Sequence, residues 1–128
     1  ARAMGADLAY IGSAFIATEE ANAEQAYKQA IVDYDSSEIV YSSLFTGING
    51  NYLKPSIRSA GMDPDNLPEG DPSKMDFGSG GNSDAKAWKD IWGCGQGIGA
   101  VKAVESAGDM VARLSREYAA AMQRIQAA

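Results

Sequence analysis

A short segment near the start of the chain has the residue types of a phosphate-binding turn. Residues 8–11 are apolar and are typical of a short buried strand. Gly12 and Ser13 follow directly, so backbone amides and a hydroxyl lie at the carboxyl end of that strand. Turns of this kind hold phosphate groups in α/β proteins, because their N–H groups point at the anion. The segment therefore indicates an anion site, although an ordinary strand end before a helix has the same pattern.

A second cluster of small residues occupies 93–99, with glycine at every other position. Glycine allows a backbone to approach a ligand closely, and Gln96 would be the polar side chain offered there. The spacing is GxGxGxG rather than GxGxxG, and we expect a helix instead of a strand before it. A dinucleotide-binding fold is therefore disfavoured, and a helix end followed by a flexible turn is the structural alternative.

Chemistry that depends on histidine or on paired thiols is excluded. The chain has no histidine, which removes Ser-His-Asp and Cys-His catalysis and the usual zinc sites. Cys94 is the single cysteine, so no internal disulfide can form and a reducing, cytoplasmic location is expected. No neighbouring residue in the sequence would activate this thiol. The acidic segment 62–84 lacks the spacing of a calcium loop, so we expect no metal site.

The charge balance limits the classes of partner. Asp and Glu number 17 against 11 Lys and Arg, which gives a net charge of −6, and the basic residues form no run. Nucleic acids and anionic membranes attract proteins through clustered Lys and Arg. No stretch approaches the ~20 apolar residues of a membrane-spanning helix. We therefore expect neither nucleic acid nor membrane as a partner.

The first half of the chain predicts two helices separated by an ambiguous segment. Thr18 has the side chain of an N-cap, and apolar residues at helical spacing run from there to Tyr34. Residues 38–46 are partly β-branched and aromatic, so a short strand and an extended binding segment both remain open. A short helix over 52–60 follows, and Gly61 would end it.

The second half begins with an irregular region. Residues 62–84 are rich in Asp, Pro and Gly and are typical of a long loop. A short helix is expected over 85–92, where Trp88 and Trp92 lie one helical turn apart. That spacing favours packing in a core over stacking on a flavin or a base.

A long amphipathic helix is expected at the end of the chain. Ser106 and Asp109 have the spacing of a capping box, so the helix should start there. We expect its apolar face to dock on its own domain, and a coiled-coil partner is the alternative. That face consists of Met110, Val111, Leu114, Tyr118, Ala121, Met122 and Ile125.

Three segments together resemble the C-terminal part of the nitronate monooxygenase family, once called 2-nitropropane dioxygenases. They are residues 5–20 (GADLAYIGSAFIATEE), 51–56 (NYLKPS) and 87–99 (AWKDIWGCGQGIG). The resemblance implies an α/β fold, namely an FMN-binding (β/α)8 TIM barrel, and oxidative denitrification of an alkyl nitronate as a small-molecule substrate. An FMN-dependent NAD(P)H:quinone or enoyl-thioester reductase of the same family remains open. From another class, a small non-catalytic helical interaction module also remains open.

The resemblance also implies which residues contact FMN. The first segment matches the last barrel strand, where the family binds the FMN phosphate, and the Gly-Gln-Gly motif should lie near the flavin or substrate cavity. Cys94 stands where the family often has a small residue such as alanine. The catalytic base of the family lies outside this chain. The implied cofactor-binding residues are Tyr10, Ile11, Gly12, Ser13, Gln96 and Gly97.

Length sets a further expectation. Family members are roughly two to three times as long, in line with the ~250 residues of a whole barrel. We therefore expect residues 1–128 to be the C-terminal third of one barrel domain, with the last strand and phosphate turn in 6–17 and helices plus the long loop in 18–128. Taken alone, it should be mainly α-helical and should self-associate, because one barrel strand has unpaired edges. It should bind FMN weakly or not at all.

Overall fold

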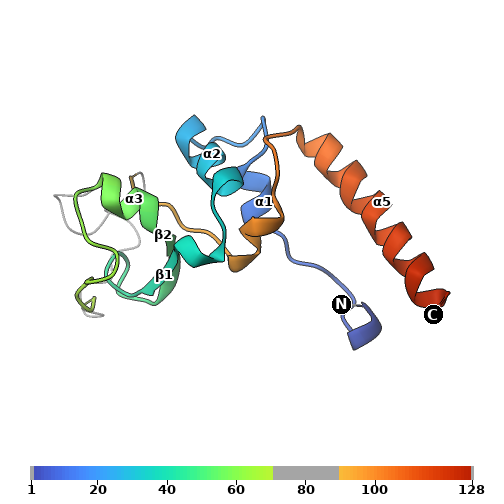
Figure 1. The fold of residues 1–128 in the computed structure, drawn as a ribbon, viewed down its shortest axis with the longest axis horizontal. Helices are drawn as coiled ribbons and strands as arrows, with labels where there is room; N and C mark the ends of the chain where they lie inside the picture. Colours follow the sequence, from blue (N-terminus) through green and yellow to red (C-terminus); the bar gives the residue numbers. More distant parts are fainter. Residues whose placement is uncertain (1, 71–89, 128) are drawn as a thin grey trace.

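Short helices and one two-stranded hairpin make up the computed structural model, which describes residues 2–70 and 90–127. Both ends of the chain project from a body formed by the middle segments (Figure 1). The longer elements are α1 (Ser13–Ile16), α2 (Gln25–Asp33), β1 (Ile39–Ser42), β2 (Gly50–Leu53), α3 (Lys54–Ser59) and α5 (Ala107–Gln126). Three 3-10 turns, η1 (Arg2–Met4), η2 (Ser36–Glu38) and η4 (Gln96–Ala100), complete the described elements.

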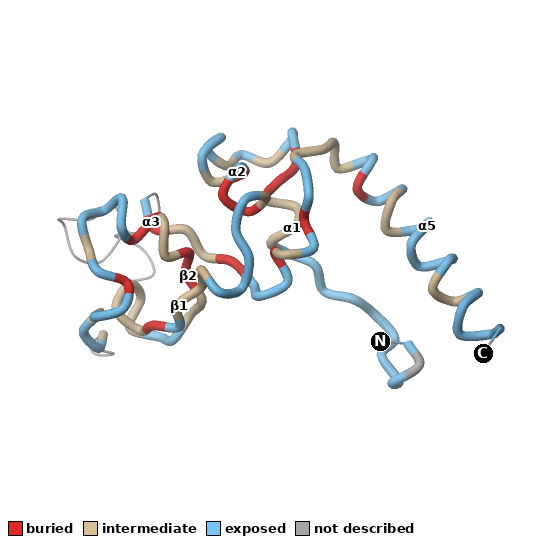
Figure 2. The backbone as a smooth tube through the Cα atoms, viewed as in Figure 1, coloured by how far each residue is buried: buried red, intermediate tan, exposed pale blue. Residues whose placement is uncertain are grey.

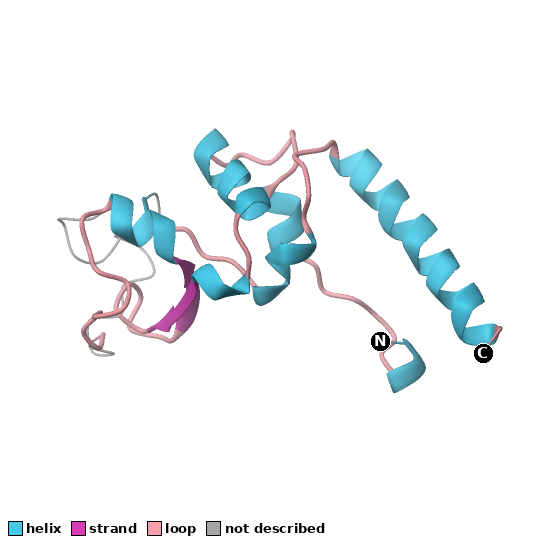
Figure 3. Cartoon of the chain, in the orientation of Figure 1, coloured by secondary structure: helices cyan, strands magenta, loops and turns pink. Residues whose placement is uncertain are grey.

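The mixture of helices with a small sheet is compatible with a piece of an α/β barrel enzyme. Helices predominate over strands in the described residues, as Figure 3 shows. The strands of those residues form a single two-stranded sheet and no barrel. Residues 71–84 of the expected loop and 85–89 of the expected helix lie outside the described part.

The expected strand over residues 8–11 is not formed. Residues 6–12 have no regular secondary structure, and the side chains of Leu8 and Tyr10 are 93% and 102% exposed. A strand needs a neighbouring strand to accept and donate its backbone hydrogen bonds. Within residues 2–70 and 90–127 no strand pairs with this segment. Its apolar side chains therefore lie on the surface (Figure 2).

The expected helix from Thr18 to Tyr34 is also wrong in its first part. Thr18 is buried, and its hydroxyl donates to the carbonyl of Phe15 at 2.8 Å instead of capping a helix. It also forms a parallel bridge with Glu105, which draws the backbone away from helical geometry. Helix α2 begins later, at Gln25, and ends within one residue of the expected position.

The ambiguous segment 38–46 contains a strand. β1 pairs antiparallel with β2, with Ile39 opposite Leu53 and Ser42 opposite Gly50. This pairing takes residues 50–53 into the sheet, so α3 starts two residues after the expected helix start at residue 52.

Helix α3 ends at the signal expected from the sequence. Pro55 is tolerated in its first turn, where the missing N–H has no partner to lose. Gly61 has a φ of +80°, the left-handed conformation that ends helices and that side chains with a Cβ disfavour.

Two small clusters of apolar side chains form the core. The larger one joins α1, α2, β2 and η4, and the smaller one lies between the hairpin and α3. The larger cluster contains Ala17, Ala30, Ile31, Leu53, Cys94, Ile98 and Val101. The smaller one contains Tyr52, Ile57 and Ile91.

Helix α5 starts where the capping box predicted. The Ser106 hydroxyl accepts from the backbone N–H of Asp109 at 3.0 Å. Docking of the whole helix is wrong for the described residues: Met110 is buried, but Tyr118 is 51% and Ile125 57% exposed. The helix leaves the body after its first turn (Figures 1 and 2).

Candidate functional site

The two small-residue motifs meet at one hydrogen bond. Ser13 is the first residue of α1, and Gly95 directly precedes η4. The backbone N–H of Gly95 donates to Ser13 Oγ at 2.7 Å. A Cβ added to Gly95 would lie 3.4 Å from that oxygen, in ordinary van der Waals contact. The structure thereby brings the expected phosphate turn beside the Gly-Gln-Gly motif.

The remaining sequence-predicted residues fall into two groups. Gln96 and Gly97 lie in η4 and are exposed next to the Ser13–Gly95 contact. A Cβ added to Gly12 or Gly97 would meet nothing within 4 Å, so the backbone there is open to an approaching group. Tyr10 and Ile11 lie in the exposed segment that leads to α1, and the body does not cover them.

An aromatic pair, which sequence analysis missed, supports η4 from the α2 side. The rings of Tyr27 and Trp92 are stacked, with centroids 5.2 Å apart and planes 9° from parallel. The Tyr27 hydroxyl also donates to the carbonyl of Gly93. Helical spacing predicted that Trp92 packs in a core, but no spacing signal in the sequence joins it to Tyr27. The pairing follows from tertiary structure.

Two ionisable groups, Cys94 of the 93–99 motif and Tyr27 of α2, stay neutral at ordinary pH. Burial raises the pKa of the Cys94 thiol to about 11. Burial, followed by repulsion from an ionised Cys94, raises the pKa of Tyr27 to about 12. A buried neutral thiol is a poor nucleophile, and a neutral phenol is a poor base. Cys94 and Tyr27 therefore act as packing groups, in keeping with the passive role predicted for the cysteine.

A second set of contacts joins the chain entering the body to the chain leaving it. The backbone N–H of Glu19 donates to the carbonyl of Glu105 at 3.1 Å. The Glu20 carboxylate accepts from the N–H of Ala107 at 2.9 and 3.1 Å, which places a negative charge at the N-terminus of α5. Arg113 of α5 reaches back to Glu105 at 2.7 Å. The start of α5 is therefore held firmly against residues 17–20.

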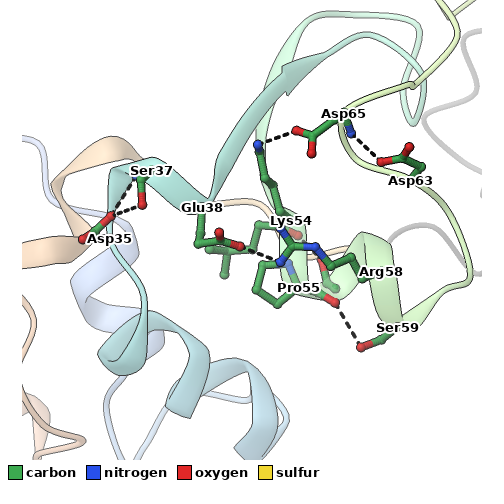
Figure 4. A network of polar contacts seen from close by, with 11 residues as sticks. Asp35, Ser37, Glu38, Lys54, Pro55, Arg58, Ser59, Asp63 and Asp65 are labelled. Carbon is green, nitrogen blue, oxygen red and sulfur yellow. Dashed lines mark hydrogen bonds and ion pairs between the residues drawn. The ribbon is translucent and has the colours of Figure 1, made fainter.

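A polar network lies around α3 and the loop that follows it (Figure 4). Arg58 pairs with Glu38 at 2.6 Å, and Lys54 pairs with Asp65 at 2.6 Å. Hydrogen bonds, first of all from Asn66, lower the pKa of the neighbouring Asp63 carboxyl. The two ion pairs therefore tie the loop and η2 to α3.

The described residues offer no metal site and one notable hollow. No group of three Asp, Glu, Cys or His side chains in that part of the chain could hold a metal ion. A hollow of about 610 Å³ lies between the hairpin and residues 64–70, and none of the sequence-predicted site residues lines it. Among the helices of residues 2–70 and 90–127, none combines the length and apolarity needed to cross a membrane.

A curated protein matches nearly the whole chain. A nitronate monooxygenase from Paraburkholderia phytofirmans is 26% identical to the chain over 132 aligned residues. The alignment covers 98% of this chain and 36% of that protein, so the chain spans about a third of the length of its curated relative. No family model matches the chain. No solved structure matches it either. The match supports a resemblance to nitronate monooxygenases over nearly the whole chain.

Proposed function

We propose that this chain is part of an FMN-dependent oxidoreductase that oxidises alkyl nitronates. The observation that carries the proposal is the hydrogen bond between Ser13 and Gly95. It joins two of the three segments that carry the family resemblance, although they are distant in sequence. The name and alignment of the Paraburkholderia protein favour the same function.

The residues at this contact fit the phosphate end of FMN. Ser13 Oγ accepts from Gly95, which leaves its own O–H to donate to a phosphate oxygen. The exposed amide of Gln96 adds a second donor, and Gly12 and Gly97 leave the backbone approachable. In this proposal Gly12, Ser13, Gln96 and Gly97 would hold and orient the phosphate. FMN, when bound, supplies the redox chemistry.

The exposed segment before Ser13 has a role in the same proposal. Leu8, Tyr10 and Ile11 are apolar yet exposed, which is costly unless another surface covers them. As the last strand of a barrel, residues 6–12 would pair with neighbouring strands and bury these side chains. The phosphate turn would then lie at the carboxyl end of the barrel, where α/β barrels bind their ligands.

The test uses the full-length product of the gene that contains these residues. We expect the purified protein to be yellow and to release FMN on denaturation. Ser13→Ala should lower the FMN content, because one phosphate donor is lost, while Ser115→Ala on the exposed side of α5 should not. A colourless full-length protein that takes up no added FMN would overturn the proposal.

Activity assays then separate the members of the family. Oxygen uptake with an alkyl nitronate is the expected result. NADH oxidation with a quinone and no reaction with nitronate would replace the proposed activity with that of a reductase. The isolated 128-residue chain should bind FMN only weakly, because it provides the phosphate contacts without the rest of the pocket.

A further inference from the structure

Helix α5 carries an unpartnered apolar seam beyond its first turn. Val111, Leu114, Tyr118, Ala121 and Ile125 recur at alternating spacings of three and four residues, the pattern of a coiled coil. Val111, Tyr118 and Ile125 are 55%, 51% and 57% exposed. The helix projects from the body along this stretch (Figures 1 and 2), and the other two residues, Leu114 and Ala121, are half-buried.

We propose that the seam of α5 pairs, antiparallel, with the same seam of a second copy of this chain. In an antiparallel pair, each a position faces a d position of the other helix. The large Tyr118 then packs over the small Ala121 of the second copy, and Leu114 faces Ile125. A parallel pair would stack tyrosine on tyrosine and alanine on alanine, which leaves one layer crowded and the next one hollow.

The charges beside the seam favour one register of this antiparallel pair. Glu117 and Arg124 are seven residues apart, so they occupy equivalent positions along the same edge of the seam. The register that faces Tyr118 with Ala121 brings Glu117 of each copy opposite Arg124 of the other, once on each side of the two-fold axis. A slip of one heptad would instead bring the two Glu117 side chains together. The charge pattern therefore disfavours that register.

The contacts at the start of α5 leave Glu117 available to pair with Arg124 of a second copy. Arg113 is held by Glu105 at 2.7 Å and by Glu117 at 3.1 Å, and the side chain of Glu117 remains 61% exposed. A carboxylate has two oxygens, so Glu117 can keep Arg113 and still accept from Arg124 of the second copy. The capped and anchored first turn presents the rest of the helix as a preformed surface, which lowers the entropy lost on pairing.

This inference is independent of the proposed flavin chemistry. The self-association expected from the sequence was based on unpaired strand edges, whereas α5 provides a defined interface on another element. Association of the 128-residue chain requires no FMN and no other part of a longer protein. A colourless protein that binds no FMN would therefore not contradict pairing through α5. A monomeric chain would likewise not contradict the proposed oxidoreductase function.

Sedimentation equilibrium of the 128-residue chain over a concentration series tests the seam. We expect a monomer–dimer equilibrium. Tyr118→Glu should raise the dissociation constant of the dimer by ~100-fold, because each copy would bury a charge in the interface. Ala119→Glu adds the same charge at the exposed residue that follows Tyr118 in the chain. It should change the dissociation constant of the dimer by ~2-fold or less. Circular dichroism of both variants checks that α5 stays helical.

Charge exchange tests the register. Glu117→Arg alone and Arg124→Glu alone should each weaken the dimer by ~10-fold, because like charges then face each other twice. The double variant restores both opposite-charge pairs and should return to within ~2-fold of the original chain. A chain that is monomeric at every concentration overturns the proposal. So does a dimer that Tyr118→Glu leaves intact, or one that the double exchange does not restore.

Discussion

Ser13 and Gly95 are 82 residues apart in the chain, and one hydrogen bond of 2.7 Å joins them. The hydroxyl oxygen of Ser13 accepts from the N–H that precedes η4, so the start of α1 and the start of η4 hold each other in place. Both residues were predicted from the sequence as parts of separate small-residue motifs. Their contact makes one candidate site out of two.

Replacing Ser13 by alanine should destabilise the junction. The N–H of Gly95 loses its acceptor, but it is exposed, so water replaces part of the lost interaction. We expect Ser13→Ala to lower the free energy of unfolding by ~1 kcal/mol or less. Urea unfolding followed by tryptophan fluorescence measures it, because Trp92 lies close to Gly95 in the chain.

Ser115→Ala is the matched control for that experiment. Ser115 is exposed in the middle of α5, where alanine is the better helix former, so stability should stay equal or rise slightly. Equal unfolding curves for Ser13→Ala and the control would show that the hydrogen bond contributes nothing.

Elements with local signals were predictable from the sequence. Ser106 and Asp109 placed the start of α5, and Gly61 marked the end of α3. Each signal acts through the backbone of its own neighbours, so spacing alone reveals it. The small-residue motifs around Ser13 were found for the same reason.

Elements that depend on distant partners were not predictable. Residues 8–11 have the composition of a strand, but no other strand of the described residues pairs with them. Thr18 has the side chain of a helix cap, yet its backbone bridges Glu105. The stacking of Tyr27 on Trp92 has no counterpart in the spacing of either residue. These features follow from tertiary contacts that a single sequence does not encode locally.

Alkaline pH should destabilise the protein by ionising the buried Cys94 and the half-buried Tyr27. Burial raises the pKa of Cys94 from 9.0 to about 11 and that of Tyr27 from 10.0 to about 12. In both cases the folded state holds the proton more tightly than the unfolded state. The stabilisation from these groups is therefore complete below pH 9 and is lost progressively between pH 9 and 12.

The two contributions can be separated by substitution. Tyr27→Phe keeps the ring that stacks on Trp92, so it should flatten the decline in unfolding free energy between pH 10 and 12. Cys94→Ala should flatten the decline between pH 9 and 11. Tyr41→Phe changes a tyrosine that is 69% exposed and should leave the profile unchanged. A Tyr27→Phe protein that loses stability as steeply as the original would contradict the assignment.

The first turn of α5 should depend on the Ser106 side chain. Its Oγ accepts from the N–H of Asp109 at 3.0 Å and donates to the Asp109 carboxylate at 2.7 Å. Ser106→Ala removes both bonds and should lower the opening free energy of this turn by ~1 kcal/mol. Amide hydrogen exchange at Asp109 and Met110 measures the loss, which should appear as faster exchange.

Ser106→Asp provides the conservative test of the same cap. Aspartate caps helices as well as serine does, so the N–H of Asp109 regains an acceptor. The second carboxylate lies close to Asp109 and Glu20, however, and repulsion among the three should make the rescue partial. Exchange rates should therefore fall between those of the original chain and of Ser106→Ala. If Asp109 and Met110 exchanged as slowly in Ser106→Ala as in the original chain, the Glu20–Ala107 contact alone would hold the first turn.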